Sequence, residues 1–548
     1  MFSLATVNEA IADAVPDREA IVFRNRRITY RVLTDRTRRL ANYLLSRGLR
    51  CHTPRADMAD WESGQDTLAL YLYNGNEYLE GMLAGYRARV APFNVNYRYV
   101  EEELLYLLNN AGTKAIIYHS EFAPRLQSIR AGVPTLEVLI QVADESGNAL
   151  LPGAVEYEAT LAGASSAPPA ADCSPDDLYI LYTGGTTGMP KGVLWRQADI
   201  LAAALGGRDA ATGKIIESLG AYQERAKLGG TRMLPAAPFM HGAGHWIAFT
   251  AFHAGHTVIV QDEVRRLDAP GLLEIIEREH VGFLQIVGDA FARPVLDAMA
   301  TGPHDLSGLA SILSGGAPLN AALKAEFLAH LPHLVLIDGL GSSEAGGQGS
   351  LITTASTGAS TGRFLPGPDN AILAEDLSAP LPPGHEGIGW WAKTGPIPLG
   401  YLGDEEKTKK TFVTVQGIRY SVPGDRARLL ADGAIELHGR DSVTINSGGE
   451  KIFAEEVEHA IKHHPGVYDA VVAGRPSERW GQEVVAIVRI RDGHAVSEQV
   501  LLEECARHIA RYKHPKQFIF VTDIQRSPSG KADYRWAKEQ ALAASAAQ

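Results

Sequence analysis

One stretch of this chain, LYILYTGGTTGMPKGV at Leu178–Val193, narrows the possible folds more than any other. Its apolar start, Leu178 to Tyr182, predicts a buried strand, and Gly192–Trp195 predicts a second strand. The glycines between them let the backbone turn tightly and approach a ligand closely. Successive backbone N–H groups in such a loop bind anions, and three threonine hydroxyls and one lysine ammonium add donors. The stretch therefore predicts a site for a polyphosphate.

This loop differs from a Walker motif, in which Gly-Lys-Ser/Thr opens a helix. Here Lys191 leads into the strand pattern that begins at Gly192. A plain surface hairpin is the alternative, and the full run Thr-Thr-Gly-Met-Pro-Lys-Gly argues against it because a glycine–threonine hairpin needs no lysine. The residues expected to contact phosphate are Thr183, Gly184, Gly185, Thr186, Thr187, Gly188 and Lys191.

Length and charge limit the kinds of protein that this sequence can encode. A chain of 548 residues exceeds what one hydrophobic core supports, so at least two domains are expected. The net charge of −12 argues against a general nucleic-acid binder. No apolar run reaches the roughly 18 residues of a transmembrane helix, and the N-terminus lacks a signal-peptide pattern. Three widely spaced cysteines, Cys51, Cys173 and Cys505, favour a reducing compartment, so a cytoplasmic location is expected.

Strand patterns alternate with helical patterns from Thr67 to Glu344, which predicts an α/β fold with parallel strands. Within this region, residues 206–232 give only a mixed pattern. The strands expected at 311–318 and 335–344 end in glycine and polar residues. Open α/β sheets bind ligands at such strand ends, so these segments are expected to line the site.

The pattern of predicted secondary structure changes after about residue 385, where short strands dominate. Residues 433–440 predict a hairpin arm, and a compact α+β pattern follows, ending in an Ala-rich tail at 541–548. The predicted division is an N-terminal domain at 1–439, a hinge at 440–442 and a C-terminal domain at 443–548.

The loop at 178–193 resembles the phosphate loop of the adenylate-forming, or AMP-binding, enzymes. These include acyl-CoA synthetases, luciferases and the adenylation domains of peptide synthetases. Five further stretches resemble that family's motifs in the same order, and together they span most of residues 178–535. The resemblance implies a large layered N-terminal domain with parallel sheets flanked by helices, and a small mobile α+β C-terminal domain. It also implies ATP, Mg²⁺ and CoA as cofactors.

The nucleotide site is expected on two of these stretches. Glu344 follows a Gly/Ser turn, and a hard oxygen ligand suits Mg²⁺ on ATP phosphates; the matching glutamate binds Mg²⁺ in the family. The position of Leu340 often carries an aromatic residue in the family, so only apolar contact with adenine is expected here. The residues expected along the nucleotide are Gly315, Gly316, Ala317, Pro318, Asp338, Gly339, Leu340, Gly341, Ser342 and Ser343.

Ribose contacts are expected from Asp425 and Arg440. A carboxylate accepts strong hydrogen bonds from both ribose hydroxyls. Asp425 matches the family's ribose aspartate, although Pro423 departs from the usual pattern before it. Outside this context a single aspartate or arginine is usually a solvated surface charge.

The region after Arg440 resembles the mobile parts of the family. Gly448, Gly449 and Lys451 match the loop that enters the active site for thioester formation, where two glycines let the backbone line a pantetheine tunnel. Lys531 matches the lysine that stabilises attack of the carboxylate on the α-phosphate. The family's hinge residue is usually Asp or Lys; here Ser442 holds that position and Asp441 precedes it, so either can be the hinge.

The acyl site is expected around His241, which matches the family's aromatic-or-histidine gate; a lone histidine is as often structural. The residues expected to line the acyl pocket are His241, Trp246, Val287, Gly288, Asp289 and Gly315. Small residues leave room there, which favours a bulky acid over acetate. Four runs resemble actinobacterial synthetases for steroid side chains, namely 73–77, 91–98, 287–293 and 443–456. A steroid-type or medium-to-long-chain acid is therefore favoured.

The predicted function is an ATP-dependent acyl-CoA synthetase. It would form acyl-AMP and pyrophosphate from a carboxylic acid, and then acyl-CoA and AMP, with Lys531, Glu344 and His241 as catalytic residues. The expected partners are the acid and CoA, with no nucleic acid, and a homodimer is left open. Three alternatives remain: an enzyme that loads an acyl carrier protein, a luciferase-like oxidative enzyme, and an inactive acyl- or nucleotide-binding homologue.

Overall fold

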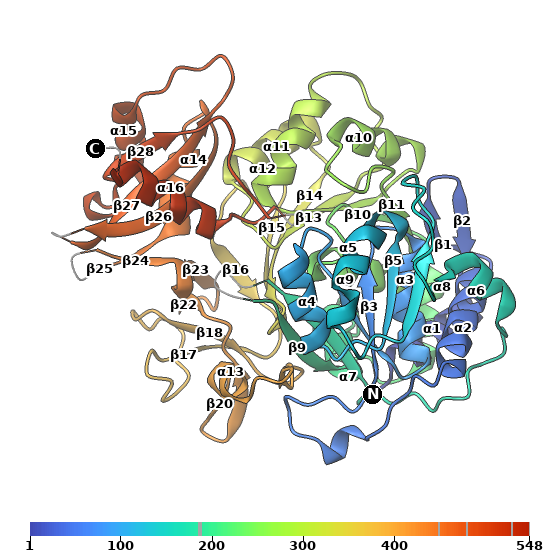
Figure 1. Ribbon diagram of the computed structural model, residues 1–548. Helices are drawn as coiled ribbons and strands as arrows, with labels where there is room; N and C mark the ends of the chain where they lie inside the picture. The colour runs from blue at the N-terminus through green and yellow to red at the C-terminus, as the bar shows by residue number, and fades with distance from the viewer. Residues whose placement is uncertain (185–188, 448–449, 478–479, 528–529, 547–548) are drawn as a thin grey trace.

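The computed structural model describes residues 1–184, 189–447, 450–477, 480–527 and 530–546 (Figure 1). The expected α/β fold is confirmed, with a large N-terminal domain and a separate, smaller C-terminal domain, orange to red in Figure 1. Among the described residues, none of the helices has the length and hydropathy that a membrane span requires.

A parallel sheet forms one layer of the N-terminal domain. Its strands, in spatial order, are β4 (Ala91–Asn94), β3 (Thr67–Tyr71), β5 (Ala115–His119), β6 (Val138–Val142) and β7 (Val155–Glu156). The first four are almost entirely buried, as expected for strands that read as continuous apolar runs. The helices of this part of the chain are α1 (Leu4–Ala14), α2 (Tyr30–Ser46), α3 (Asn76–Arg87), α4 (Glu101–Asn110), α5 (Ala123–Ile129) and α6 (Tyr157–Gly163).

A second, larger sheet provides the strand ends that build the site. Its parallel strands, in spatial order, are β1 (Glu19–Phe23), β11 (Thr257–Val260), β10 (Arg232–Pro235), β12 (Phe283–Ile286), β13 (Ser311–Gly315) and β14 (Val335–Ser342), with β2 (Arg26–Thr29) antiparallel at the edge. The helices that connect these strands include α9 (Gly242–His253), α10 (Ala269–Arg278), α11 (Gly288–Met299) and α12 (Ala321–His330). Because parallel strands end at the same edge of a sheet, the segments after β10, β12, β13 and β14 meet there.

The same sheet continues with antiparallel strands toward the C-terminal domain. Their spatial order after β14 is β15 (Gly346–Thr353), β16 (Arg363–Pro366), β23 (Ile435–Arg440), β22 (Asp425–Leu429), β18 (Gly389–Lys393), β21 (Ile418–Ser421) and β20 (Phe412–Val415), with β17 (Asn370–Leu373) beside β18. Helix α13 (Glu405–Thr411) precedes β20. The hairpin arm expected at 433–440 is β23, and its pairing with β22 sets Asp425 directly opposite Arg440.

The strands expected on either side of the phosphate loop are confirmed as β8 (Leu178–Thr183) and β9 (Lys191–Arg196). They form an antiparallel hairpin, with β19 (Gly400–Tyr401) paired to β9 and α7 (Gln197–Ala204) after it. The buried Trp195 ring donates from Nε1 to the Ser343 carbonyl at 2.9 Å. The hairpin is thereby tied to the end of β14, so the two predicted phosphate-binding segments lie next to each other.

The C-terminal domain has the predicted α+β pattern. Its sheet consists of β25 (Glu450–Phe453), β24 (Thr444–Ser447), β27 (Gly481–Ile490), β26 (Val467–Ser477) and β28 (Gln517–Phe520). The helices are α14 (Ala454–Lys462), α15 (Glu498–His508) and α16 (Tyr534–Ala546). Cys505 lies in the core of this domain.

Two helices were missed by the sequence patterns. Residues 206–232 contain α8 (Leu219–Leu228), which buries only Tyr222 and Ala226 and so leaves a weak apolar stripe. Residues 541–546 of the Ala-rich tail belong to α16, whose buried positions include Ala537 and Ala541. Alanine contrasts little with its neighbours in hydrophobicity, so its burial is hard to detect from the pattern alone.

Candidate active site

Lys531 lies between the two domains, against the glycine turn that follows β13. A Cβ built on Gly316, whose φ is +91°, would lie 3.5 Å from Lys531 Cε. Because Gly316 has no side chain, the backbone of the turn can approach the aliphatic part of Lys531 closely, as the glycine pattern at 315–318 suggested. Lys531 is an exposed residue, but the partial loss of water beside the turn, aided by the Arg440 guanidinium, lowers the pKa of Lys531 to about 8, while Glu344 and Asp425 oppose this shift. The charges that act on Lys531 are thus the residues expected at the nucleotide.

Glu344 is held at this edge of the sheet by neighbours from three strands. Its Oε1 accepts a hydrogen bond from the Tyr401 hydroxyl at 2.9 Å, and its backbone carbonyl accepts one from Ser421 Oγ. The preceding residue, Ser343, is held by Trp195. No group of three His, Cys, Asp or Glu side chains within the described part of the chain could hold a metal. One fixed carboxylate suits Mg²⁺, which is usually shared with substrate phosphates.

Asp425 and Arg440 lie side by side on β22 and β23. Arg440 Nε donates to Asp425 Oδ1 at 3.2 Å, and Asp425 is buried. The two residues expected at the ribose are thus brought together within reach of Lys531. The aspartate raises the pKa of Arg440 further, so the guanidinium stays charged.

His241 occupies the turn between β10 and α9, and its imidazole is neutral. Burial lowers the pKa of His241 to about 3, and the positive charge of Lys531 adds to that effect. Its Nε2 is buried and has no hydrogen-bond partner among the described residues. Buried polar atoms are rarely left unpaired, so this nitrogen indicates a ligand.

His245, one turn further along α9, has a structural role instead. Its Nδ1 contacts the Phe239 carbonyl at 2.6 Å, and its Nε2 contacts the Tyr179 hydroxyl. Trp246 Nε1 donates to the same hydroxyl at 2.7 Å. Trp246, expected at the acyl group, is therefore fixed in orientation by a buried network.

Four of the expected site residues have protein partners. Lys191 Nζ lies 2.6 Å from Asp404, and Lys451 Nζ lies 2.8 Å from Glu375. Asp338 pairs with the fully buried Lys324, while burial raises the pKa of Asp338 to about 6. Asp289, expected at the acyl group, accepts instead from Asn320 N at 2.8 Å and from Lys462 Nζ at 3.4 Å.

The remaining predicted residues fall into three groups. Thr183 is the last residue of β8 and Gly184 follows it, whereas Gly185, Thr186, Thr187, Gly188, Gly448 and Gly449 lie outside the described residues. Gly288, with φ +53°, lies against the 315–318 turn, because a Cβ there would lie 2.4 Å from the Pro318 carbonyl. Leu340 packs toward the cluster around Trp391, and Ser342 Oγ is buried without a partner among the described residues.

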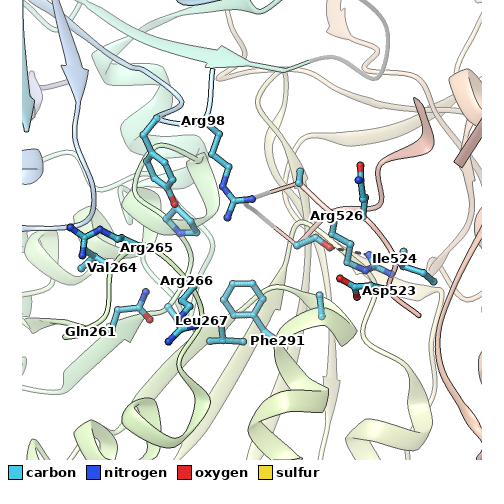
Figure 2. A pocket seen from close by; sticks show the side chains of 17 residues that line it. Arg98, Gln261, Val264, Arg265, Arg266, Leu267, Phe291, Asp523, Ile524 and Arg526 are labelled. Carbon is cyan, nitrogen blue, oxygen red and sulfur yellow. Dashed lines mark hydrogen bonds between the residues drawn. The ribbon is translucent and has the colours of Figure 1, made fainter. Parts of the chain in front are cut away.

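A cavity of about 570 Å³ opens beside the Lys531 loop (Figure 2). Arg98, Arg265 and Arg266 line it from the N-terminal domain, and Arg526 lines it from the C-terminal domain. Arg98 is also close enough to lower the pKa of His241. Sequence reasoning missed this cationic lining, for which the only signal was a pair of arginines just after β11.

The sequence profile of AMP-binding enzymes matches residues 8–396 of this chain, and that of the AMP-binding enzyme C-terminal domain matches residues 456–531. This chain belongs to the AMP-binding enzyme family. The predicted family resemblance is confirmed.

Relatives of this AMP-binding enzyme match along its whole length. It is 55% identical to the medium-chain acyl-CoA ligase Mig of Mycobacterium avium, over 99% of this chain and 98% of the relative. It is 39% identical to the 3-oxocholest-4-en-26-oate–CoA ligase of Rhodococcus rhodochrous, over 98% and 96%. The crystal structure of the anthranilate CoA ligase AuaEII with anthranoyl-AMP superposes with a TM-score of 0.82 at 21% identity, over 100% of this chain and 98% of that one. That likeness confirms the fold.

The lowered pKa of Lys531 predicts how adenylate formation by this AMP-binding enzyme depends on pH. Lys531 is a cation below its pKa, so kcat/KM for ATP is expected to fall as pH rises through about 8. Pyrophosphate release at saturating acid, measured from pH 6 to 10, checks this. Conversion of preformed acyl-adenylate should instead rise over this range, because the CoA thiol ionises near pH ~8.5. A fall confined to the ordinary lysine range near pH ~10 would contradict the prediction.

Proposed function

We propose that this chain is an AMP-forming acyl-CoA ligase that activates a medium-chain carboxylic acid, with ATP, Mg²⁺ and CoA. One observation carries the proposal: Lys531 lies beside the Gly316 turn, at the strand edge that also holds Glu344, Asp425 and a His241 nitrogen with no partner in the described part of the chain. The medium chain is favoured by the relative at 55% identity, and a steroid acid is the second candidate because of the relative at 39%. We place the reaction in the cytoplasm, where its three free cysteines persist.

In the first step, a carboxylate oxygen of the acid attacks the α-phosphorus of ATP, and the bond to pyrophosphate breaks. Both reactants are anions, so positioning and charge neutralisation lower the barrier. Lys531, mostly protonated at pH 7, would stabilise the charge that develops at the α-phosphate. Asp425 would accept hydrogen bonds from the ribose, and the neutral His241 would contact the acid. Mg²⁺, held by Glu344, would supply positive charge at the phosphates.

In the second step, the CoA thiolate attacks the acyl carbonyl and AMP leaves. We assign the hinge to 440–442, between an N-terminal domain at 1–439 and a C-terminal domain at 443–548. A short 3₁₀ turn at Asp441–Val443 follows β23 directly, which suits a segment that changes its backbone angles. Rotation about it would withdraw Lys531 and bring Lys451 and its loop into the site. The thiol comes from CoA, so no cysteine of the chain takes part.

The N-terminal side of the cationic cavity in Figure 2, which remains when the Lys531 loop withdraws, is proposed to receive the CoA phosphates. Arginine binds phosphate through two parallel, charge-assisted hydrogen bonds. Arg265 already pairs with Glu121, whereas Arg98 and Arg266 have no salt bridge within the described part of the chain. These two side chains are therefore the best placed to accept a new anionic partner.

The double variant Arg98→Gln/Arg266→Gln is expected to raise KM for CoA at least about tenfold, because two charge-assisted hydrogen bonds are lost. Adenylate formation should change little, and KM for ATP should stay the same. Steady-state kinetics with varied CoA check this, with Arg47→Gln, an exposed arginine just after α2, as the matched control. An unchanged KM for CoA would place the nucleotide of CoA elsewhere.

Pyrophosphate release with a panel of acids, with and without CoA, tests the function itself. The panel includes acetate, octanoate, palmitate, cholanoate and a steroid side-chain acid. Turnover that requires CoA and peaks at octanoate is expected. A peak on steroid acids would replace the medium-chain assignment and keep the reaction. Turnover only with an acyl carrier protein would overturn the choice of CoA as acceptor, and none with any acid would favour an inactive homologue.

A further inference from the structure

A row of side chains with alternating charges runs from the N-terminal to the C-terminal domain. Asp289, in the first turn of α11, accepts a hydrogen bond from Lys462 Nζ at 3.4 Å. Lys462, at the end of α14, also lies 3.2 Å from Asp469 on β26. Asp469 in turn receives both arms of Arg526, from Nε at 2.7 Å and from Nη2 at 2.6 Å. Only the Asp289–Lys462 step spans the two domains.

Arg526, the last residue in this row of charges, holds the loop that carries Lys531. Arg526 Nη1 donates to the carbonyl of Gly530, the residue before the lysine, at 2.9 Å. The loop is closed by Ser527 N donating to the Lys531 carbonyl at 2.8 Å. Every nitrogen of the Arg526 guanidinium is thus engaged, one with the loop and two with Asp469. Because the guanidinium group is planar and all its nitrogens are bonded, it fixes the loop in one orientation.

The first turn of α11 touches the same loop a second time. A Cβ on Gly530, whose φ is +75°, would lie 3.3 Å from Ala290 Cβ and from the Phe291 ring. Figure 2 shows Phe291 and Arg526 bordering the same cavity. One helix start therefore holds the loop both by packing and, through Asp289, by charge.

This row of charges is more buried than an ordinary surface ion pair. Between 13% and 15% of each of its four side chains is exposed. Another ion pair between the domains, Lys451–Glu375, leaves 48% and 63% exposed. Water and salt screen the exposed pair, which therefore contributes little, whereas a shielded pair keeps its strength. Asp289 is also fixed on its own side by the Asn320 backbone N–H.

We propose that Asp289, Lys462, Asp469 and Arg526 form an ionic latch that holds the Lys531 loop in place for adenylate formation. The four are positioning residues: Arg526 contacts the loop, and the other three act on it through Arg526. The inference rests on the proposed function and extends it, because domain rotation must break the Asp289–Lys462 link while the other links travel with the C-terminal domain. It also gives Asp289 a role different from the acyl contact expected for it.

Asp289→Asn tests the latch with little other change. The amide oxygen can still accept from Asn320 N, and the Lys462–Asp469–Arg526 links within the C-terminal domain remain. Adenylate formation at saturating substrates is expected to slow about tenfold, within the range of typical coupling between two states. KM for the acid should not change, and conversion of preformed acyl-adenylate to acyl-CoA should stay within about twofold. Lys462→Gln should match it, and the double variant should be no slower than either single one.

Glu375→Gln is the matched control, since it removes the exposed ion pair between the domains and should leave adenylate formation unchanged. Hydrogen exchange of residues 527–533 gives a readout that needs no turnover. The loop amides, including Gly530 N and Lys531 N, should exchange faster in Asp289→Asn than in the wild type or in Glu375→Gln.

The outcomes separate the latch from the proposed function. Unchanged adenylation and unchanged exchange in Asp289→Asn would overturn the latch, as would equal losses in both half-reactions. A raised KM for the acid in Asp289→Asn alone would assign Asp289 to the acyl pocket. A wild type inactive in both half-reactions would overturn the proposed function, and faster loop exchange in Asp289→Asn would still support the latch.

Discussion

Lys531→Ala is expected to slow adenylate formation at least about a hundredfold, the size of effect seen when a preorganised electrostatic group is removed. The ammonium sits against Gly316, within electrostatic reach of Arg440, Glu344 and Asp425. ATP binding should remain largely intact, because the phosphate loop and Asp425 belong to the N-terminal domain and Arg440 lies at the hinge. Pyrophosphate release and ATP binding, measured separately, check the two statements.

The same variant should hardly slow conversion of preformed acyl-adenylate to acyl-CoA, since Lys531 would have left the site by then. Lys538→Ala, an exposed lysine on α16 of the same domain, is the matched control and should behave as the wild type. Equal losses in the two half-reactions would rule out the two-conformation scheme.

Glu344→Gln carries the second large expected effect. Glutamine keeps the length of the side chain and still accepts from the Tyr401 hydroxyl, so the end of β14 should keep its shape. The lost negative charge removes the proposed ligand of Mg²⁺, and adenylate formation should fall at least about a hundredfold. Pyrophosphate release titrated with Mg²⁺ should show a requirement shifted to higher concentration.

Glu344→Asp keeps the charge on a shorter side chain and should lose less activity than Glu344→Gln. Thermal unfolding of Glu344→Gln should match the wild type, because glutamine keeps the hydrogen bond with Tyr401 and Ser421 holds the backbone of this residue. A Glu344→Gln enzyme within about tenfold of wild-type rate, with an unchanged Mg²⁺ requirement, would contradict a metal-binding role.

Several parts of the fold could be predicted because their signal is local. The strands β8 and β9, the glycine turn after β13 and the α14 helix each follow from a short run of residues whose periodicity is set by the backbone. Helix α8 and the tail of α16 could not be predicted, since Tyr222, Ala226, Ala537 and Ala541 give little contrast between a buried and an exposed face.

The candidate site divides in the same way. Lys531, Glu344, Asp425 and Arg440 could be named because each lies in a motif with its own glycines and spacing. The partners of these residues could not be named. Tyr401 on Glu344, Trp195 on Ser343 and the neutral state of His241 depend on distances between strands far apart in the chain.

The sequence by itself determined the family, the two-domain α/β architecture and the residues that carry its motifs, because these follow from short-range pattern and chemistry. Only the tertiary structure shows the cavity lined by Arg98, Arg265, Arg266 and Arg526. The same holds for the row of charges that links Asp289 to the Lys531 loop. A single arginine or aspartate has no local signature. Its partner is fixed by how domains pack, and the strength of the pair by how much water that packing excludes.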